Sequence, residues 1–104
     1  MSDTTYNGWT NYETWNVKLW LDNEQSTYYD VTRHASDVYT EAMDMEEAPD
    51  AYDLAAWLKD YVTDMAPELP ASMFSDLLNA ALSEVNWQEI AEVYLSDAKE
   101  EANA

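Results

Sequence analysis

Residues 11–23 read NYETWNVKLWLDN, a stretch rich in large apolar side chains. Thr10 precedes it and Glu13 follows three residues later, which is the spacing of a capping box at a helix start. A helix that is apolar on two faces lies between other elements, so we expect this one to be the central, most buried helix. Its apolar residues recur at helical spacing on two faces, with Tyr12, Trp15 and Leu19 on one and Val17, Trp20 and Leu21 largely on another.

Two amphipathic helices are predicted after this stretch. Ser26 or Thr27 can cap a helix over about residues 27–46, and Asp50 can cap one over about residues 51–65. Each carries an apolar face at the i, i+3, i+4 spacing. These faces hold Tyr28, Val31, Ala35, Val38 and Ala42 in the first helix, and Leu54, Leu58, Tyr61, Val62 and Met65 in the second.

Two more helices are predicted in the last third of the chain. A helix over about residues 71–84 is expected to turn its apolar residues inward, namely Phe74, Leu77, Leu78, Ala81, Leu82 and Val85. Asn86 and Glu89 form a second capping box, which predicts a helix over about residues 87–100. Its apolar stripe runs through Trp87, Ile90, Ala91, Tyr94 and Ala98.

Length and periodicity together predict the fold class. A chain of 104 residues is the size of one domain. No segment shows the sustained alternation of a strand, although residues 4–10 could be extended. We therefore predict a compact all-α single domain of four to five helices over residues 1–104, with residues 1–9 and 101–104 flexible.

The charge balance limits the possible partners. The chain has 22 acidic and 4 basic residues, a formal net charge of −18. A DNA duplex carries one phosphate charge per about 1.7 Å of axis, so a protein that binds it needs a basic surface, as does one that binds an anionic membrane. Neither nucleic acid nor a membrane is therefore an expected partner, which leaves basic protein grooves and metal ions. The apolar fraction of 47% predicts a folded domain rather than a disordered tail.

The residue inventory excludes several kinds of site. The chain has no cysteine, which excludes disulfides and zinc–thiolate sites. Its single glycine, Gly8, excludes glycine-rich phosphate loops. We find no signal-peptide pattern and no apolar run of membrane-spanning length, so we expect a cytoplasmic protein.

No enzymatic constellation stands out. The single histidine, His34, lies between Asp30 and Asp37 on one predicted helix, and no nucleophile motif accompanies it. We interpret it as a surface residue and predict no catalytic residue and no cofactor. Carboxylate pairs are common among 22 acids, and the EF-hand spacing is absent, so no dedicated metal site is predicted.

The acidic helix faces are the strongest functional signal. Carboxylates three or four residues apart rise about 5–6 Å along a helix. Successive phosphates of one DNA strand rise about 3.4 Å each along the axis and lie roughly 6–7 Å apart through space, so a row of carboxylates can imitate a run of phosphates. Trp57 borders one such row, where an aromatic ring suits an Arg or Lys of a partner. The predicted partner-binding residues are Asp30, Asp37, Glu41, Asp44, Asp53, Asp60, Asp64 and Trp57.

Two segments resemble a family of small, acidic, uncharacterised proteins of phages, plasmids, bacteria and archaea. NYETWNV at residues 11–17, with the apolar helix after it, resembles their N-terminal motif, and NWQEIA at residues 86–91 resembles a W-x-E-I-A helix near their C-terminus. The matches cover about a fifth of the chain, and the resemblance implies a mobile-element setting without an established activity. Antirestriction and several anti-CRISPR proteins share this charge and setting, and they mimic DNA; that likeness is an analogy.

From charge, spacing and setting we predict a non-enzymatic inhibitor that mimics DNA. It would occupy the nucleic-acid-binding groove of a basic host defence protein, of restriction or CRISPR machinery, and a homodimer could extend the acidic surface. Two alternatives stay open: an acidic protein-binding adaptor, and a halophile-adapted protein whose acidity serves only solvation. The charge of −18 exceeds the magnitude of about 2–8 that solubility needs, which favours a binding role.

Overall fold

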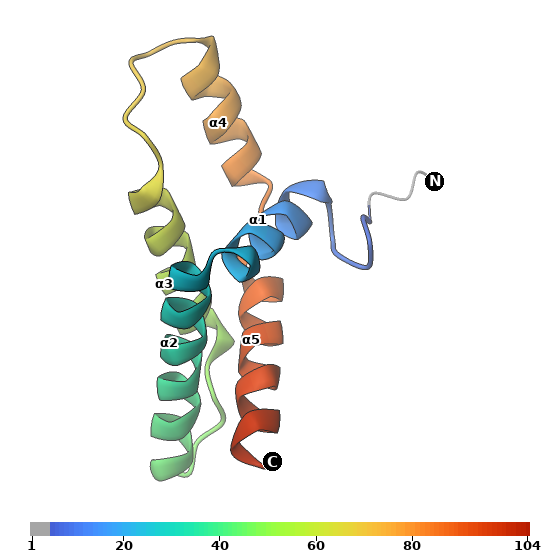
Figure 1. Ribbon diagram of the computed structural model, residues 1–104, viewed down its shortest axis with the longest axis vertical. Coiled ribbons are helices and arrows are strands. Elements are labelled where there is room, and N and C mark those ends of the chain that lie inside the picture. Colours follow the sequence, from blue (N-terminus) through green and yellow to red (C-terminus); the bar gives the residue numbers. More distant parts are fainter. Residues whose placement is uncertain (1–4) are drawn as a thin grey trace.

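The computed structural model describes residues 5–104, which form one all-α domain (Figure 1). Its five helices are α1 Tyr12–Asn23, α2 Gln25–Asp44, α3 Ala51–Met65, α4 Met73–Ser83 and α5 Trp87–Ala102. No strand occurs among the described residues; before α1 the backbones of Tyr6 and Trp9 exchange two hydrogen bonds of 2.8 Å across a turn. The predicted fold class is confirmed, and what was expected of residues 1–4 lies outside the described part.

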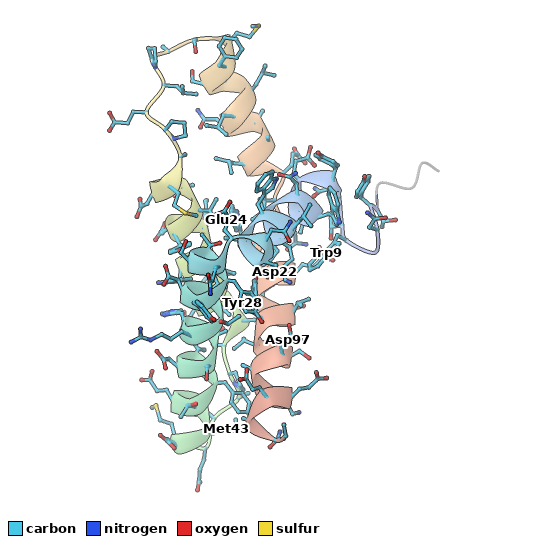
Figure 2. The ribbon with its side chains drawn as sticks, in the orientation of Figure 1. Trp9, Asp22, Glu24, Tyr28, Met43 and Asp97 are labelled. Carbon is cyan, nitrogen blue, oxygen red and sulfur yellow. The ribbon has the colours of Figure 1, made fainter. Side chains whose placement is uncertain are left out.

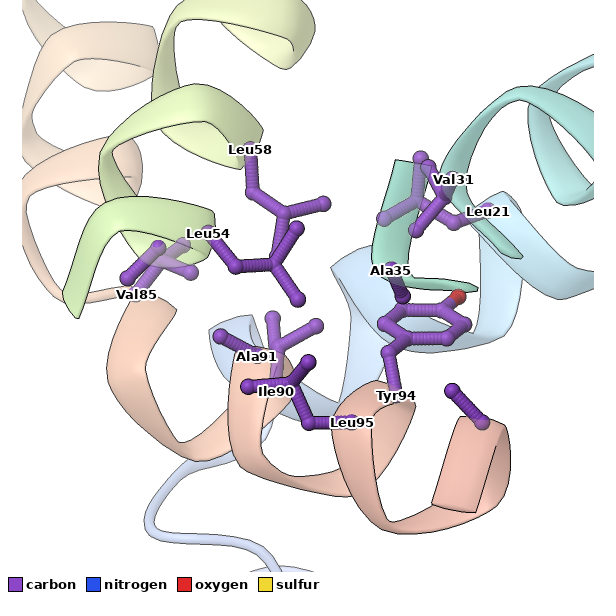
Figure 3. Close-up of a cluster of buried hydrophobic side chains, with 12 residues drawn as sticks. Leu21, Val31, Ala35, Leu54, Leu58, Val85, Ile90, Ala91, Tyr94 and Leu95 are labelled. Carbon is purple, nitrogen blue, oxygen red and sulfur yellow. The ribbon is translucent and has the colours of Figure 1, made fainter. Parts of the chain in front are cut away.

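The central helix is α5. It packs most extensively against α3 and α2, and α1 contacts it as well. Its buried residues recur at helical spacing: Ile90, Ala91, Tyr94, Leu95 and Ala98. Figure 3 shows Leu54 and Leu58 of α3 pointing toward Ile90, while Ala35 of α2 lies beside the Tyr94 ring. The core is therefore built around the last helix of the chain.

The prediction that residues 11–23 form the central helix is wrong. In α1 the buried residues are Thr14 and Leu21, while Tyr12 and Trp20 are 50% and 59% exposed. Figure 1 shows α1 lying across the upper ends of α2 and α5 rather than running along them. A crossing helix of 12 residues, about 18 Å long, is covered only where it meets its neighbours. Apolar side chains of both predicted faces, Tyr12 on one and Trp20 on the other, therefore stay exposed.

Side-chain caps account for where α1 and α3 begin. Asp50 caps α3 as predicted, by accepting a hydrogen bond of 2.9 Å from the backbone N–H of Tyr52. At α1 the cap is Asn11, which accepts from the backbone N–H of Thr14 at 2.9 Å. The predicted cap, Thr10, lies one residue too early.

The helix ends also differ by two residues at four places, one of which is the start of α4, at Met73 instead of residue 71. α2 begins at Gln25 and ends at Asp44, each two residues before the prediction, and neither Ser26 nor Thr27 caps it. The Thr27 hydroxyl instead donates to the backbone carbonyl of Leu21 at 2.8 Å and so links α2 to the end of α1. α5 continues two residues past its predicted end.

α4 differs most from its prediction. Of the residues expected to point inward, only Val85 is buried, and it follows the helix. Phe74 and Leu77 are 66% and 60% exposed, while Leu78 and Leu82 are half-buried. In Figure 1, α4 stands at one end of the domain beyond α1. Among the described helices, α4 makes no extensive contact with any other, so most of its apolar residues stay uncovered.

Hydrogen bonds join the start of α1 to the start of α5. We call the residues that form these bonds the clasp: Thr10, Asn11, Thr14, Asn86 and Glu89. The fully buried Thr14 hydroxyl donates to the Asn11 side chain at 2.6 Å and accepts from the Asn86 backbone N–H at 2.9 Å. The Glu89 carboxylate accepts from the Thr10 backbone N–H at 3.0 Å. Asn86 caps α5 as predicted, but Thr14 replaces Glu89 in the reciprocal bond. The two family-like segments therefore meet in the clasp.

Candidate protein-binding face

α2 and α3 meet along three aromatic side chains, His34, Trp57 and Tyr61, which we call the aromatic seam. The His34 and Trp57 rings stack with centroids 4.1 Å apart and planes 10° apart. Trp57 also stacks on Tyr61, at 4.8 Å and 20°. The Tyr61 hydroxyl donates to the Asp30 carboxylate at 2.7 Å. Contacts between residues 30 and 61 and between residues 34 and 57 show that the two helices run antiparallel.

A hollow of about 300 Å³ lies over the aromatic seam. It is lined by Asp30, Arg33, His34, Asp37, Trp57 and Tyr61. The structure thus brings together three of the predicted binding residues, Asp30, Asp37 and Trp57, from two helices. An apolar floor with carboxylates at its rim suits the guanidinium or ammonium group of a partner.

Four predicted residues form a row along α2: Asp30, Asp37, Glu41 and Asp44. With 3.6 residues per turn they fall within an arc of about 60° and span about 21 Å of the axis. All four are exposed. The buried Val31 points to the other side of the helix, into the core, so the row faces solvent.

Asp53, Asp60 and Asp64 form a matching row on α3, within an arc of about 40° and over about 16 Å. All three are exposed, while Leu54 and Leu58 on the other side are fully buried. On both helices the aromatic seam lies between the row and the core, so the two rows face the same side of the domain. We call these seven carboxylates the acidic face.

Two features of this region were not predicted from the sequence. Trp57 is half-buried, because His34 and Tyr61 stack against it; that packing depends on the register between two helices. Arg33 lines the hollow, and its place three residues after Asp30 and four before Asp37 could have indicated this.

Tyr61 is the titratable group that the seam perturbs. Burial, and then its hydrogen bond to Asp30, raises the pKa of Tyr61 from 10.0 to about 12. Because the native pKa lies above the unfolded value, this bond stabilises the fold fully below pH 10, and the stabilisation is lost as the pH rises toward about 12.

We expect Tyr61→Phe to remove one tyrosine that ionises near pH 12 from a phenolate absorbance titration. In Asp30→Ala the same tyrosine should ionise at lower pH but still above 10, because burial remains the largest cause of the shift. Tyr94, whose pKa burial also raises, will ionise late in every variant. If Tyr61→Phe loses phenolate absorbance near pH 10 instead of near pH 12, the assignment is contradicted.

One carboxylate serves the fold instead of the acidic face. Asp22 forms an ion pair with Lys18 and accepts a hydrogen bond of 2.6 Å from the Tyr94 hydroxyl. The Lys18 ammonium lies 4.6 Å from the Tyr94 ring centroid, so the three groups join α1 to α5. Figure 2 shows Asp22 with Tyr28 and Asp97 where α1, α2 and α5 meet, around a hollow of about 190 Å³.

Two other kinds of site are absent from the described part of the chain. Among residues 5–104, no three acidic or histidine side chains gather as a metal-binding group would require. None of the described helices combines the length and the apolar character needed to cross a membrane.

Comparison with known proteins gave one match. Residues 2–102 match a family whose description is "Family of unknown function (DUF7249)". No curated protein and no solved structure matches the chain. The match covers both segments of the clasp and the whole of the acidic face.

Proposed function

The chain belongs to the DUF7249 family of unknown function, and from its surface we propose a non-enzymatic inhibitor whose acidic face occupies the nucleic-acid-binding groove of a host defence protein. That partner is a basic protein of restriction or CRISPR machinery in the host cytoplasm. The observation that carries the proposal is the acidic face itself, seven exposed carboxylates in two rows on one side of α2 and α3.

The dimensions of the acidic face support mimicry of DNA. The α2 row spans about 21 Å, which is the rise of about six phosphates at 3.4 Å each. The axes of packed helices lie about 8–10 Å apart. This separation is larger than the width of the DNA minor groove, about 6 Å, and smaller than that of the major groove, about 12 Å. The two rows can therefore stand in for two phosphate rows that border a groove.

The energetics also favour a cationic partner. Exposed carboxylates on one face steer a basic protein toward it, which accelerates association and makes it sensitive to salt. The hollow over the aromatic seam adds a place where an arginine of the partner can lie against the rim carboxylates of Asp30 and Asp37. The acidic charge then raises the association rate and orients the partner, and the hollow accommodates one of the partner's side chains.

A pull-down from host lysate with the immobilised protein tests the proposal. We expect capture of a DNA-binding enzyme at low salt, release of that enzyme by duplex DNA, and weaker capture as salt rises. An activity assay of the captured enzyme should then show inhibition that excess DNA relieves.

The alternatives give different results in the same experiment. Capture of a protein that DNA cannot displace would indicate an adaptor role instead of DNA mimicry. A chain that unfolds at low salt and folds only near molar salt would indicate halophilic adaptation, which helical circular dichroism across a salt series detects.

A further inference from the structure

A hollow of about 650 Å³ lies between α3 and the segment that joins α4 to α5. It is lined by the buried side chains of Ala55 and Val85 and by the aromatic rings of Tyr52 and Trp87. A second hollow of about 320 Å³ shares Lys59, Val85 and Trp87 with it, so the two are continuous. Volumes of this size and an apolar lining are typical of small-molecule sites.

Tyr52 and Trp87 offer ring surface that the fold does not use. Tyr52 is 72% exposed and Trp87 is half-buried. Within the part of the chain that the structure describes, neither ring stacks on another aromatic ring, in contrast to Trp57 of the aromatic seam. Aromatic rings pack favourably against other rings in offset or edge-on arrangements. The hollow therefore suits a planar aromatic group.

Most of the neutral polar side chains that line this hollow already have hydrogen-bond partners. The Asn11 amide bonds within the clasp and to the backbone carbonyl of Glu84, and the Asn86 amide bonds within the clasp. The Ser83 hydroxyl donates to the backbone carbonyl of Ala80 at 2.6 Å. Recognition of a ligand's polar group therefore falls to the charged side chains of the hollow.

Lys59 is the cation of this hollow, and Glu84 is the other charged residue that lines it. The Lys59 ammonium group has three hydrogen-bond donors, and no ion pair or hydrogen bond of residues 5–104 engages it. With 3.6 residues per turn, Lys59 lies about 100° or more around α3 from every carboxylate of the α3 row. Lys59 can therefore accept an anionic group inside the hollow.

We propose that this hollow binds a small aromatic monocarboxylate, with its ring against Tyr52 and Trp87 and its carboxylate on Lys59. One negative charge matches one ammonium group. A phosphate group carries about −1.5 to −2 charges at pH 7, which exceeds the charge of one lysine and increases the repulsion from Glu84. At physiological salt the Debye length is about 8 Å, so much of the repulsion from the rest of the chain is screened.

The hollow and the acidic face are separate surfaces. Around the axis of α3, Tyr52 and Lys59 lie on one flank of the core-facing side and the aromatic seam lies on the other. No residue that lines the hollow belongs to the acidic face. Binding of the carboxylate thus goes beyond the proposed function, and either proposal can fail while the other holds.

An NMR titration of the ¹⁵N-labelled chain with indole-3-acetate tests the proposal, and indole-3-acetamide serves as the neutral analogue. We expect a dissociation constant on the order of 1 mM for the carboxylate. The signals that move should be the backbone amides of Ala55 and Val85 and the indole N–H of Trp87. The carboxylate should bind roughly threefold more tightly than the amide, which is the size of an exposed ion pair.

Lys59→Gln and Glu84→Gln should change the affinity for indole-3-acetate in opposite directions. The first removes the ammonium group and should lower the affinity to that of the amide. The second removes a nearby negative charge and should raise the affinity roughly twofold. Lys99→Gln is the matched control, because Lys99 is also exposed and lies outside the hollow; it should leave the affinity unchanged. Lys59 and Glu84 are exposed, so helicity should not change in any variant.

Three results would overturn the proposal. The first is the absence of saturable shifts around the hollow up to about 5 mM indole-3-acetate. The second is equal affinity for the carboxylate and the amide. The third is a Lys59→Gln variant that binds indole-3-acetate as tightly as Lys99→Gln does.

Discussion

Replacing Asp37, Glu41 and Asp60 together by lysine should weaken binding of the DNA-displaceable partner by roughly 100-fold or more, since close charge pairs across a protein interface can couple by about 1.5–7 kcal/mol each. The three residues come from both rows of the acidic face and are exposed, so helicity should not change. Each reversal changes the charge by two, and the net charge moves from −18 to −12. Binding is measured by titration at low salt, and helicity by circular dichroism.

A second triple variant tests whether position or net charge matters. Glu68→Lys, Glu92→Lys and Glu100→Lys also give a net charge of −12, but these exposed residues lie outside α2 and α3. Loss of long-range steering alone should lower the association rate severalfold and leave most of the affinity. Equal losses in the two variants would mean that the acidic face has no special role.

Thr14→Val should destabilise the domain by about 2–3 kcal/mol. Valine matches threonine in shape, so the packing stays while the hydroxyl is lost. The half-buried Asn86 backbone N–H then loses its partner, and the Asn11 side chain keeps only its bond from the Thr14 backbone N–H. Against a total stability of about 5–15 kcal/mol for a domain, this is a large fraction for one oxygen atom.

Urea unfolding followed by helical circular dichroism measures this loss, and the midpoint should fall without a change in slope. Thr63→Val is the matched control, because Thr63 is exposed and its hydroxyl donates to the Lys59 carbonyl of its own helix. That variant should stay within about 0.5 kcal/mol of the parent. A Thr14→Val midpoint as high as that of the control would show that the clasp contributes nothing to stability.

Elements with strong local signals were predictable from the sequence. α3 begins and ends at its predicted residues, since the Asp50 cap and the proline after its end act within one turn. Asn86 marks the start of α5 in the same way. The two carboxylate rows were predictable too, because side chains seven and eleven residues apart share a face in any straight helix.

Properties that depend on neighbouring helices were not predictable. The sequence shows that a helix face is apolar, but it does not show whether another element of the fold covers that face. No other element covers Trp20 and Phe74, so the prediction overestimated how much of α1 and α4 is buried. The stacking of Trp57 on His34 likewise depends on the position of α2 along the axis of α3. No local sequence pattern encodes that register.

The central position of α5 has a consequence for how the chain folds as it is made. Residues 87–102 are synthesised after the other four helices, yet they supply the side chains around which α2 and α3 pack. The clasp joins residues 72 positions apart and cannot close before Asn86 has been made. The core therefore forms only after α5 has been made, several seconds after synthesis of the first helix at about 5–20 residues per second.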